Sequence, residues 1–134
     1  ETFFVNLTSD AGTNGATLST SQGTGTIADL EAAIPSVPQN IRKSPTSGTD
    51  PNYSILWDAS TGTVNHYTLE EVESAPGSST VTYSVPGTSK SFNKGDVYLE
   101  LTYRVRACTT ATETQCSAYS GTVFKLVCPS GGCP

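Results

Sequence analysis

The sequence predicts an all-β protein, and three observations indicate an antiparallel β-sandwich. Apolar and polar residues alternate along several short segments, which is the period of a half-buried strand. Turn residues recur at intervals of about 8 to 15 residues, close to the spacing that sandwiches show. No segment longer than one turn shows the 3.6-residue period of an amphipathic helix.

The first predicted element is a pair of strands within residues 1–31. The run Thr2–Leu7 is rich in aromatic and β-branched residues, which favour strands. Turn residues follow, among them Asn14 and Gly15, and a second strand is predicted over Gly23–Ile27. Two strands alone are only marginally stable in water, so we expect this hairpin to pack against something outside itself.

A proline-containing segment, residues 32–38, is predicted to be a linker or the first edge strand. Pro35 and Pro38 have no backbone N–H to donate, so they suit a domain entry or an unpaired edge. Residues 39–127 then form the predicted sandwich, and residues 128–134 form a short loop bounded by cysteines.

Within residues 39–127 the alternation defines the strands and the core. Strands are predicted over residues 53–57, 66–70, 80–85, 89–92 and 99–107, with a last one from near 119 to 127. Their inward-facing positions are Tyr53, Ile55, Trp57, Tyr67, Leu69, Leu99, Leu101, Tyr103, Val105 and Ala107. Because alternate residues of a strand share a face, we expect these side chains to form one core, with Trp57, Tyr67, Leu69, Tyr103 and Val105 at its centre.

Composition and charge restrict the partners of the chain. Its 134 residues correspond to one ordinary domain, or to one domain with a fragment of another. With seven Lys and Arg residues and a net charge of −5, it lacks the basic surface that nucleic acids and anionic membranes require. It contains no run of about 18 apolar residues, so we expect no membrane insertion. Because it opens on Glu1 without a signal-peptide pattern, we expect a mature or excised piece whose targeting signal lies elsewhere.

Four cysteines lie near the C-terminal end, at Cys108, Cys116, Cys128 and Cys133. Their spacing does not match the paired C-x₂₋₄-C of zinc sites, and the single histidine, His66, is remote in the sequence. An even number of cysteines fits disulfides and an oxidising compartment. Three pairings are possible; we favour Cys108–Cys116 with Cys128–Cys133 over the others and over four free thiols.

No catalytic constellation is visible in the sequence. His66 has no serine or cysteine at a recognisable spacing, and it precedes an inward-facing residue, so we expect it on the surface. No serine lies in a Gly-x-Ser-x-Gly frame. We therefore expect no enzymatic activity and no catalytic residues.

Three carboxylates, Glu70, Glu71 and Glu73, lie close together on one predicted strand and its end. A glycosidase needs two carboxylates that face each other across a cleft, which one strand does not provide. Glu70 is expected on the same outer face as Arg104 and Arg106. A cross-strand ion ladder is therefore the favoured interpretation.

Residues 35–127 resemble a fibronectin type III module of the bacterial secreted type. The segments that carry the resemblance are Pro35–Pro38, Ile55–Trp57, Tyr67–Leu69, Tyr103–Cys108 and Cys116–Ser120. The resemblance implies an immunoglobulin-like sandwich of seven strands with Trp57 in its core. It also implies that Cys108 and Cys116 join the hairpin of the last two strands. Leu101 stands where such modules commonly carry a corner-forming tyrosine.

Residues 1–31 resemble the C-terminal end of a Calx-β domain, through Glu1–Leu7 and Gly23–Asp29. In calcium-binding members of that family, the positions of Glu1, Asp29 and Glu31 help to hold the ion. Carboxylate oxygens are the ligands that Ca²⁺ prefers, but three scattered carboxylates do not complete its shell of six to eight oxygens. Solvated surface carboxylates, without a cofactor, are the favoured interpretation, and calcium is the alternative.

The sequence therefore indicates a non-catalytic structural or interaction module of a bacterial surface or secreted protein, located outside the cell. The partner of the N-terminal hairpin is expected to be either a neighbouring module of a longer chain or another copy, joined by strand addition into an extracellular filament. The candidate interaction residues are Phe3, Phe4, Val5, Leu7 and Ile27.

The alternative function is an adhesion or carbohydrate-binding accessory module of a larger secreted protein or enzyme. Carbohydrate binding requires a solvent-facing platform of aromatic rings. Tyr83, Tyr98 and Tyr119 are the candidates for such a platform.

Overall fold

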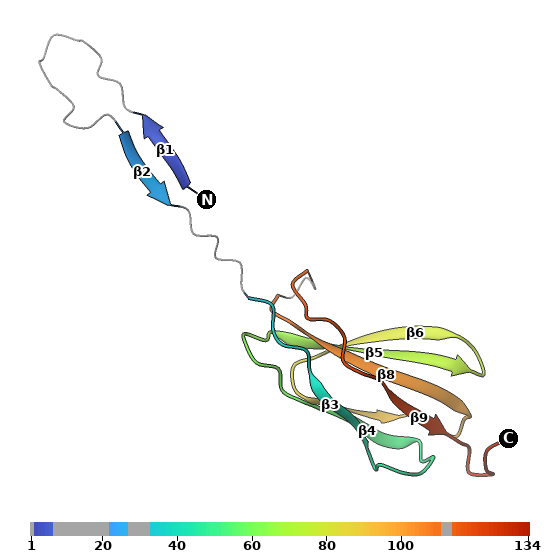
Figure 1. Cartoon of the computed structure of the whole chain (residues 1–134). Coiled ribbons are helices and arrows are strands. Elements are labelled where there is room, and N and C mark those ends of the chain that lie inside the picture. The colour runs from blue at the N-terminus through green and yellow to red at the C-terminus, as the bar shows by residue number, and fades with distance from the viewer. Residues whose placement is uncertain (1, 7–21, 27–32, 111–113) are drawn as a thin grey trace, which may run out of the picture. The chain divides into compact units, whose positions relative to one another are not determined.

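The computed structural model describes residues 2–6, 22–26, 33–110 and 114–134, and all regular structure in these ranges is β-strand (Figure 1). No helix in the described ranges is long and apolar enough to cross a membrane. The chain divides into two compact units, residues 1–31 and residues 32–134, which are described separately.

The first unit contains an antiparallel pair of strands, β1 (Thr2–Asn6) and β2 (Gln22–Thr26). Their register places Phe3 opposite Gly25 and Val5 opposite Gly23. Both strands lie close to their predicted positions. Strand β1 ends one residue earlier than predicted, and β2 begins and ends one residue earlier than predicted. They form a sheet of two strands, so each strand has one edge outside this pairing.

The second unit is an antiparallel β-sandwich of two sheets, as the alternation predicts. The first sheet has the order β3-β4-β7 and contains β3 (Gln39–Ser44), β4 (Asn52–Asp58) and β7 (Ser89–Asn93). The second sheet has the order β6-β5-β8-β9 and contains β6 (Ser79–Val85), β5 (His66–Ala75), β8 (Leu99–Cys108) and β9 (Val123–Val127). Three strands in one layer and four in the other give the immunoglobulin-like arrangement.

The core between the two sheets contains all five of the residues that the sequence predicts at its centre. The buried cluster consists of Tyr53, Ile55, Trp57, Tyr67, Leu69, Val85, Leu101, Tyr103, Val105, Ala107 and Val127. The rings of Trp57 and Tyr67 meet edge to face with centroids 5.5 Å apart, a favoured aromatic geometry. Leu99, predicted to face inward, is partly buried and packs against the cluster.

Of the two alternatives predicted for the proline-containing segment, the described residues 33–38 fit the linker and not the first edge strand. Residues 33–38 are not in a strand, and β3 begins only after Pro38, at Gln39. The physical reason is that prolines cannot donate to a ladder, so pairing with β4 starts beyond them. Most side chains of β3 are exposed, and its sequence shows little alternation of apolar and polar residues. The sequence pattern therefore did not predict this strand.

The final strand also differs from the prediction, since β9 starts at Val123 and not near Tyr119. The chain before it nevertheless follows β8. The amide of Ser117 donates to the carbonyl of Ala107, and that of Ser120 donates to Val105, each at 2.8 Å. This segment thus lies along β8 through scattered bonds without a regular ladder.

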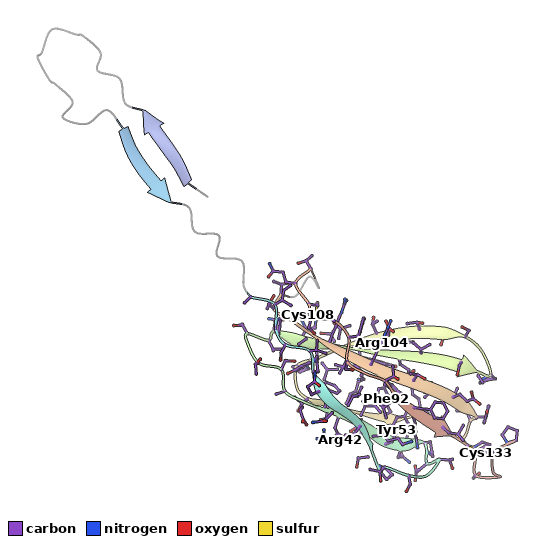
Figure 2. All side chains as sticks on the ribbon, in the orientation of Figure 1. Arg42, Tyr53, Phe92, Arg104, Cys108 and Cys133 are labelled. Carbon is purple, nitrogen blue, oxygen red and sulfur yellow. A yellow bond between two sulfur atoms is a disulfide. The ribbon has the colours of Figure 1, made fainter. Side chains whose placement is uncertain are left out.

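Both favoured disulfides are present, Cys108–Cys116 and Cys128–Cys133. The first joins the end of β8 to the returning chain, where the two cysteines also form an isolated antiparallel bridge. The second closes the short loop after β9. Figure 2 labels Cys108 and Cys133 at opposite ends of the sandwich.

Candidate functional site

A buried polar network lies within the sandwich core, at Glu71 of β5 and Tyr103 of β8. Glu71 follows Tyr67 and Leu69 at alternate positions of β5, so its side chain enters the core and is almost wholly buried. Its carboxylate accepts the hydroxyl of Tyr103 at 2.5 Å and the ammonium of Lys94 at 2.7 Å. The hydroxyl of Tyr53 bonds that of Tyr103 at 2.5 Å and extends the network toward the other sheet.

Aromatic rings surround this network. Phe92 lies among the rings of Tyr53, Tyr83 and Tyr103, with centroid distances of 5.2 to 5.4 Å, and Tyr53 and Phe92 are labelled in Figure 2. Burial, and then the neighbouring carboxylate, raise the pKa of the Tyr103 hydroxyl well above its usual range. Burial likewise raises the pKa of the Tyr53 hydroxyl. Both hydroxyls therefore remain protonated donors at physiological pH, and the network is suited to positioning the two sheets.

A lysine occupies a second buried position, on β9. Lys125 lies between Val123 and Val127 on the inward face and has no exposed surface. Its ammonium donates to the carbonyl of Gly48 at 3.0 Å and lies 4.9 Å from the centre of the Tyr53 ring. Burial lowers the pKa of this amine.

Replacing Lys125 with methionine is expected to raise the free energy of unfolding at pH 7 by about 1 kcal/mol, because it removes a buried charge at similar volume. The unfolded lysine keeps its proton up to about pH 10.5, whereas the folded one releases it at a lower pH. Between these pH values the unfolded state binds more protons, so the stability of the unsubstituted chain rises with pH. In urea titrations, the difference in free energy of unfolding between the Lys125→Met variant and the unsubstituted chain should therefore narrow from pH 7 toward pH 10.5. A variant that is less stable at pH 7 would contradict this account.

The outer face of the four-stranded sheet carries the predicted ion pair. Glu70 and Arg104 are opposite each other in the register of β5 and β8, and their side chains meet at 2.6 Å. The guanidinium of Arg104 lies 4.3 Å from the centre of the Tyr119 ring, and that of Arg106 lies 5.0 Å from it. The predicted pairing of Glu70 with Arg104 is confirmed, while Arg106 stacks on the same ring. Figure 2 labels Arg104 on this sheet.

The interaction between Glu70 and Arg104 is expected to contribute little to stability, because the arginine side chain is 44% exposed. A double-mutant cycle with Glu70→Ala and Arg104→Ala should give a coupling energy of about 0.5 kcal/mol at low salt. Salt screens exposed pairs, so the coupling should fall toward zero in about 1 M sodium chloride. A coupling that does not change with salt would show that the pair acts as a buried one.

The expectation that His66 lies on the surface is wrong. Its side chain is buried, with ring nitrogens 3.2 Å from the Asn65 side-chain oxygen and 3.4 Å from the Thr68 hydroxyl. The register places His66 opposite Cys108, so the Cys108–Cys116 disulfide stands beside it. Alternation correctly predicts that the His66 side chain lies on the outer face of the sheet. It does not predict that other residues bury this part of the outer face.

Carboxylates at the loop end of the sandwich are engaged in local hydrogen bonds around a concave surface. Asp96 accepts the amide and hydroxyl of Ser130 at 2.5 and 3.2 Å, which ties the Cys128–Cys133 loop to the loop before β8. Asp50 accepts the amide of Asn52 at 2.7 Å. These contacts order the loops.

No group of three or more His, Cys, Asp or Glu residues that could hold a metal ion occurs within the described ranges. The calcium ligands predicted from the sequence, Glu1, Asp29 and Glu31, lie outside the residues that the structure describes. The calcium interpretation thus stays a prediction.

The three tyrosines considered as an aromatic platform are each half-buried and engaged. Tyr83 packs edge to face on Phe92, with the Lys90 ammonium 4.6 Å from the centre of the tyrosine ring. Tyr98 donates to Glu100 at 2.5 Å. Tyr119 contacts the two arginines on the outer face. Tyr83 shares the inward face of its strand, so it and Tyr119 lie on different faces of the sheet.

The candidate interaction residues are only partly within the described ranges. Phe3, Phe4 and Val5 lie in β1, whereas Leu7 and Ile27 lie outside the described residues. Sequence reasoning missed the burial of the charged residues Glu71 and Lys125, and it missed Lys94 as the partner of Glu71. For Glu71 and Lys125 the signal was present, since each occupies an inward position of an alternating strand.

Comparisons with known proteins identify the fold. No family model matches the sequence, and no curated protein matches it. A solved structure described as titin kinase and its flanking domains is similar over 70% of this chain, with 14% sequence identity and a TM-score of 0.50. This chain spans 18% of that structure's chain. A second solved structure, described as a myokine structure, is similar over 69% of this chain and 98% of its own, with 17% identity and a TM-score of 0.49. At this identity the first likeness supports the immunoglobulin-like β-sandwich fold and nothing finer.

Proposed function

We propose that this chain is a non-catalytic structural module of an extracellular bacterial protein, and that copies of it assemble into a filament by strand addition. In this proposal the sandwich is a fibronectin type III module, and the N-terminal hairpin is the Calx-β-like element that joins one copy to the next. The hairpin carries the proposal, because β1 and β2 form a two-stranded sheet within the described residues of the first unit. Such a sheet needs a third strand or a packing partner to be stable.

Two features of the sandwich support a role outside the cell. A small β domain with two disulfides fits an oxidising environment, where such bonds form and persist. The disulfides close both ends of the fold, one at the end of β8 and one after β9. A module stapled in this way is suited to an extended assembly that is exposed to proteases and to mechanical load.

The geometry of strand addition supports assembly into a filament. If one surface of the chain is the donor and a different surface is the acceptor, the contact is head to tail. Head-to-tail contacts that do not close into a ring produce open filaments. The carbohydrate-binding alternative would have to use tyrosines that are half-buried and lie on different faces of the sheet.

The test is a proline placed in the donor strand. In the full chain, Phe4→Pro removes a backbone donor from the middle of β1 and prevents the regular pairing that strand addition requires. Electron microscopy should show filaments for the unsubstituted chain and only small particles for the variant. Near-ultraviolet circular dichroism, which reports on the tyrosines and the tryptophan of the sandwich, should be unchanged. Filaments of normal length in the Phe4→Pro variant would exclude the hairpin as the donor.

A further inference from the structure

One edge of the sandwich lacks the features that normally prevent edge-to-edge pairing. Strand β6, Ser79–Val85, lies at the rim of the four-stranded sheet (Figure 1). Its sequence, STVTYSV, contains no charged residue, no proline and no glycine. Its pairing with β5 is unbroken over seven positions, from Tyr67 opposite Val85 to Glu73 opposite Ser79. Long, regular and uncharged edges of this kind readily accept another strand.

The opposite sheet has an edge, β3, that is protected in several ways. Asn40 has a positive φ of 51°, and the register with β4 shifts between Gln39 and Arg42. Irregularities of this type bend an edge away from a regular partner strand. Arg42 and Lys43 add two positive charges to the same short strand. A second chain would have to bury these charges to pair here.

The other two edges are protected by lysines. On β9, Lys125 points inward, and the ammonium of Lys43 donates at 2.9 Å to the carbonyl of Phe124, a backbone acceptor of this strand. On β7, which is five residues long, Lys90 extends over the rings of Tyr83 and Phe92. Inward charges, edge lysines and short length are all devices that limit edge pairing. Among the four sandwich edges, β6 is the one whose own residues include none of them, although the Lys90 ammonium of β7 lies over the inward-facing ring of Tyr83.

The exposed side chains of β6 also favour a partner. Val81, Tyr83 and Val85 lie opposite Glu71, Leu69 and Tyr67, so they share the inward face of the sheet. Val85 is buried and Tyr83 is half-buried, but Val81 is 41% exposed. Val81 and Tyr83 thus extend the inward face of the sheet beyond the paired Glu71 and Lys94, and a further strand could cover these two side chains.

We propose that β6 is the acceptor edge and that it receives β1 from the hairpin of a second copy. This inference rests on the proposed assembly by strand addition and names its second surface. Both segments are uncharged: β1 reads TFFVN and β2 reads QGTGT. Since the chain carries a net charge of −5, copies repel one another, and contact through uncharged segments avoids most of that repulsion.

The composition of β1 matches the exposed positions of β6. Phe3 and Val5 are alternate residues, so in an added strand they would share one face. Pairing would set that face beside Val81 and Tyr83 and extend the apolar layer by one strand. The hairpin would gain the third strand that it needs, and backbone bonds along the edge would supply the affinity. Because the donor and the acceptor are different surfaces, each copy can bind the next one in a chain.

Charge substitutions on the two strands test the acceptor. Val81→Lys places a lysine on the β6 edge, and Phe124→Lys is the matched control, because Phe124 is 49% exposed on the already protected β9. In the full chain, Val81→Lys should abolish assembly in light scattering, whereas Phe124→Lys should assemble like the unsubstituted protein. Thermal unfolding of both variants checks that the sandwich is folded.

The two proposals fail in different ways. If Val81→Lys assembles normally and Phe4→Pro does not, β6 is the wrong acceptor although strand addition by the hairpin stands. If neither substitution affects assembly, or if the unsubstituted chain does not assemble, both proposals fall.

Cysteine cross-linking identifies the occupant of β6 even if Val81→Lys is poorly folded. A Val5→Cys copy and a Val81→Cys copy are mixed under mild oxidation and analysed by mass spectrometry after proteolysis, because Val5 shares the face of β1 that would lie beside Val81. Cross-links between the two kinds of copy are expected, because β1 of one chain would lie beside β6 of the other. Cross-links only between Val81→Cys copies would show that β6 pairs with itself and would overturn the assignment of β1 as its partner.

Discussion

Replacing Glu71 with alanine is expected to lower the free energy of unfolding by about 3 kcal/mol, the typical cost of breaking a buried ion pair. The substitution leaves Lys94, whose side chain is only 17% exposed, without its carboxylate. It also removes the acceptor of the Tyr103 hydroxyl, which is then bonded to Tyr53 alone. Urea unfolding followed by tryptophan fluorescence measures the change.

A neighbouring glutamate provides the control for this prediction. Glu73 lies two residues further along β5, is half-buried and accepts bonds from Gly77 and Ser79 near the turn. Glu73→Ala should cost about 1 kcal/mol or less, since it breaks only exposed local hydrogen bonds. The double variant Glu71→Leu with Lys94→Met should regain most of the lost stability, because both charges leave together. Equal losses for Glu71→Ala and Glu73→Ala would refute the role of the buried network.

Removing the Cys108–Cys116 disulfide by a double substitution to alanine is expected to lower the free energy of unfolding by about 2 to 4 kcal/mol. Cys108 has no exposed surface, and the bond fixes the start of the segment that returns along β8. That segment supplies the amides and hydroxyls of Ser117 and Ser120, which bond the backbone of β8. Denaturant titrations of the oxidised variant measure the effect.

The second disulfide is the matched control. Cys128–Cys133 closes a loop after the last strand with a sequence separation of 5, against 8 for the first disulfide. Because fewer residues are constrained and no strand is joined to another, its removal should cost less. His66, which is buried beside Cys108, gives a second readout. In nuclear magnetic resonance spectra, the imidazole N–H proton of His66 should exchange faster with solvent when the Cys108–Cys116 disulfide is removed. Removal of Cys128–Cys133 should leave this exchange rate unchanged. An equal loss of stability from the two removals would contradict the account.

Much of the sandwich could be predicted from alternation alone. Trp57, Leu69 and Val105 occupy inward positions of regular strands, and all three are buried. Alternation also predicts the outer face for Glu70 and Arg104, and the register of β5 and β8 sets the two residues opposite each other. These predictions succeeded because period, residue type and environment agree at each position.

The sequence prediction failed where tertiary packing changes the environment of a residue. His66 lies on the outer face, as its position requires, yet the disulfide region covers it. Glu71 and Lys125 occupy inward positions, but charged residues are expected outside unless they are paired, and partners from other strands cannot be read from one segment. The edge strand β3 has a register shift and little burial, so it lacks an alternating signal.

The strands that we propose as donor and acceptor show the same division between what the sequence predicts and what it does not. The aromatic and β-branched run of β1 is visible in the sequence. The uncharged run of β6 is visible too, but its significance depends on the sheet order, which places it at an edge. Sequence alone cannot say which strands are central and which are at the rim. The lack of protection at β6 therefore depends on the sheet order, which determines the strands that form the edges of the sandwich.

The particle mass of the unsubstituted chain, measured by light scattering over a range of protein concentrations and backed by electron microscopy, tests assembly by strand addition most directly. The account predicts a mass that rises with concentration far above the 14.0 kDa of one chain, together with long regular filaments. A constant mass of 14.0 kDa at every concentration would contradict it.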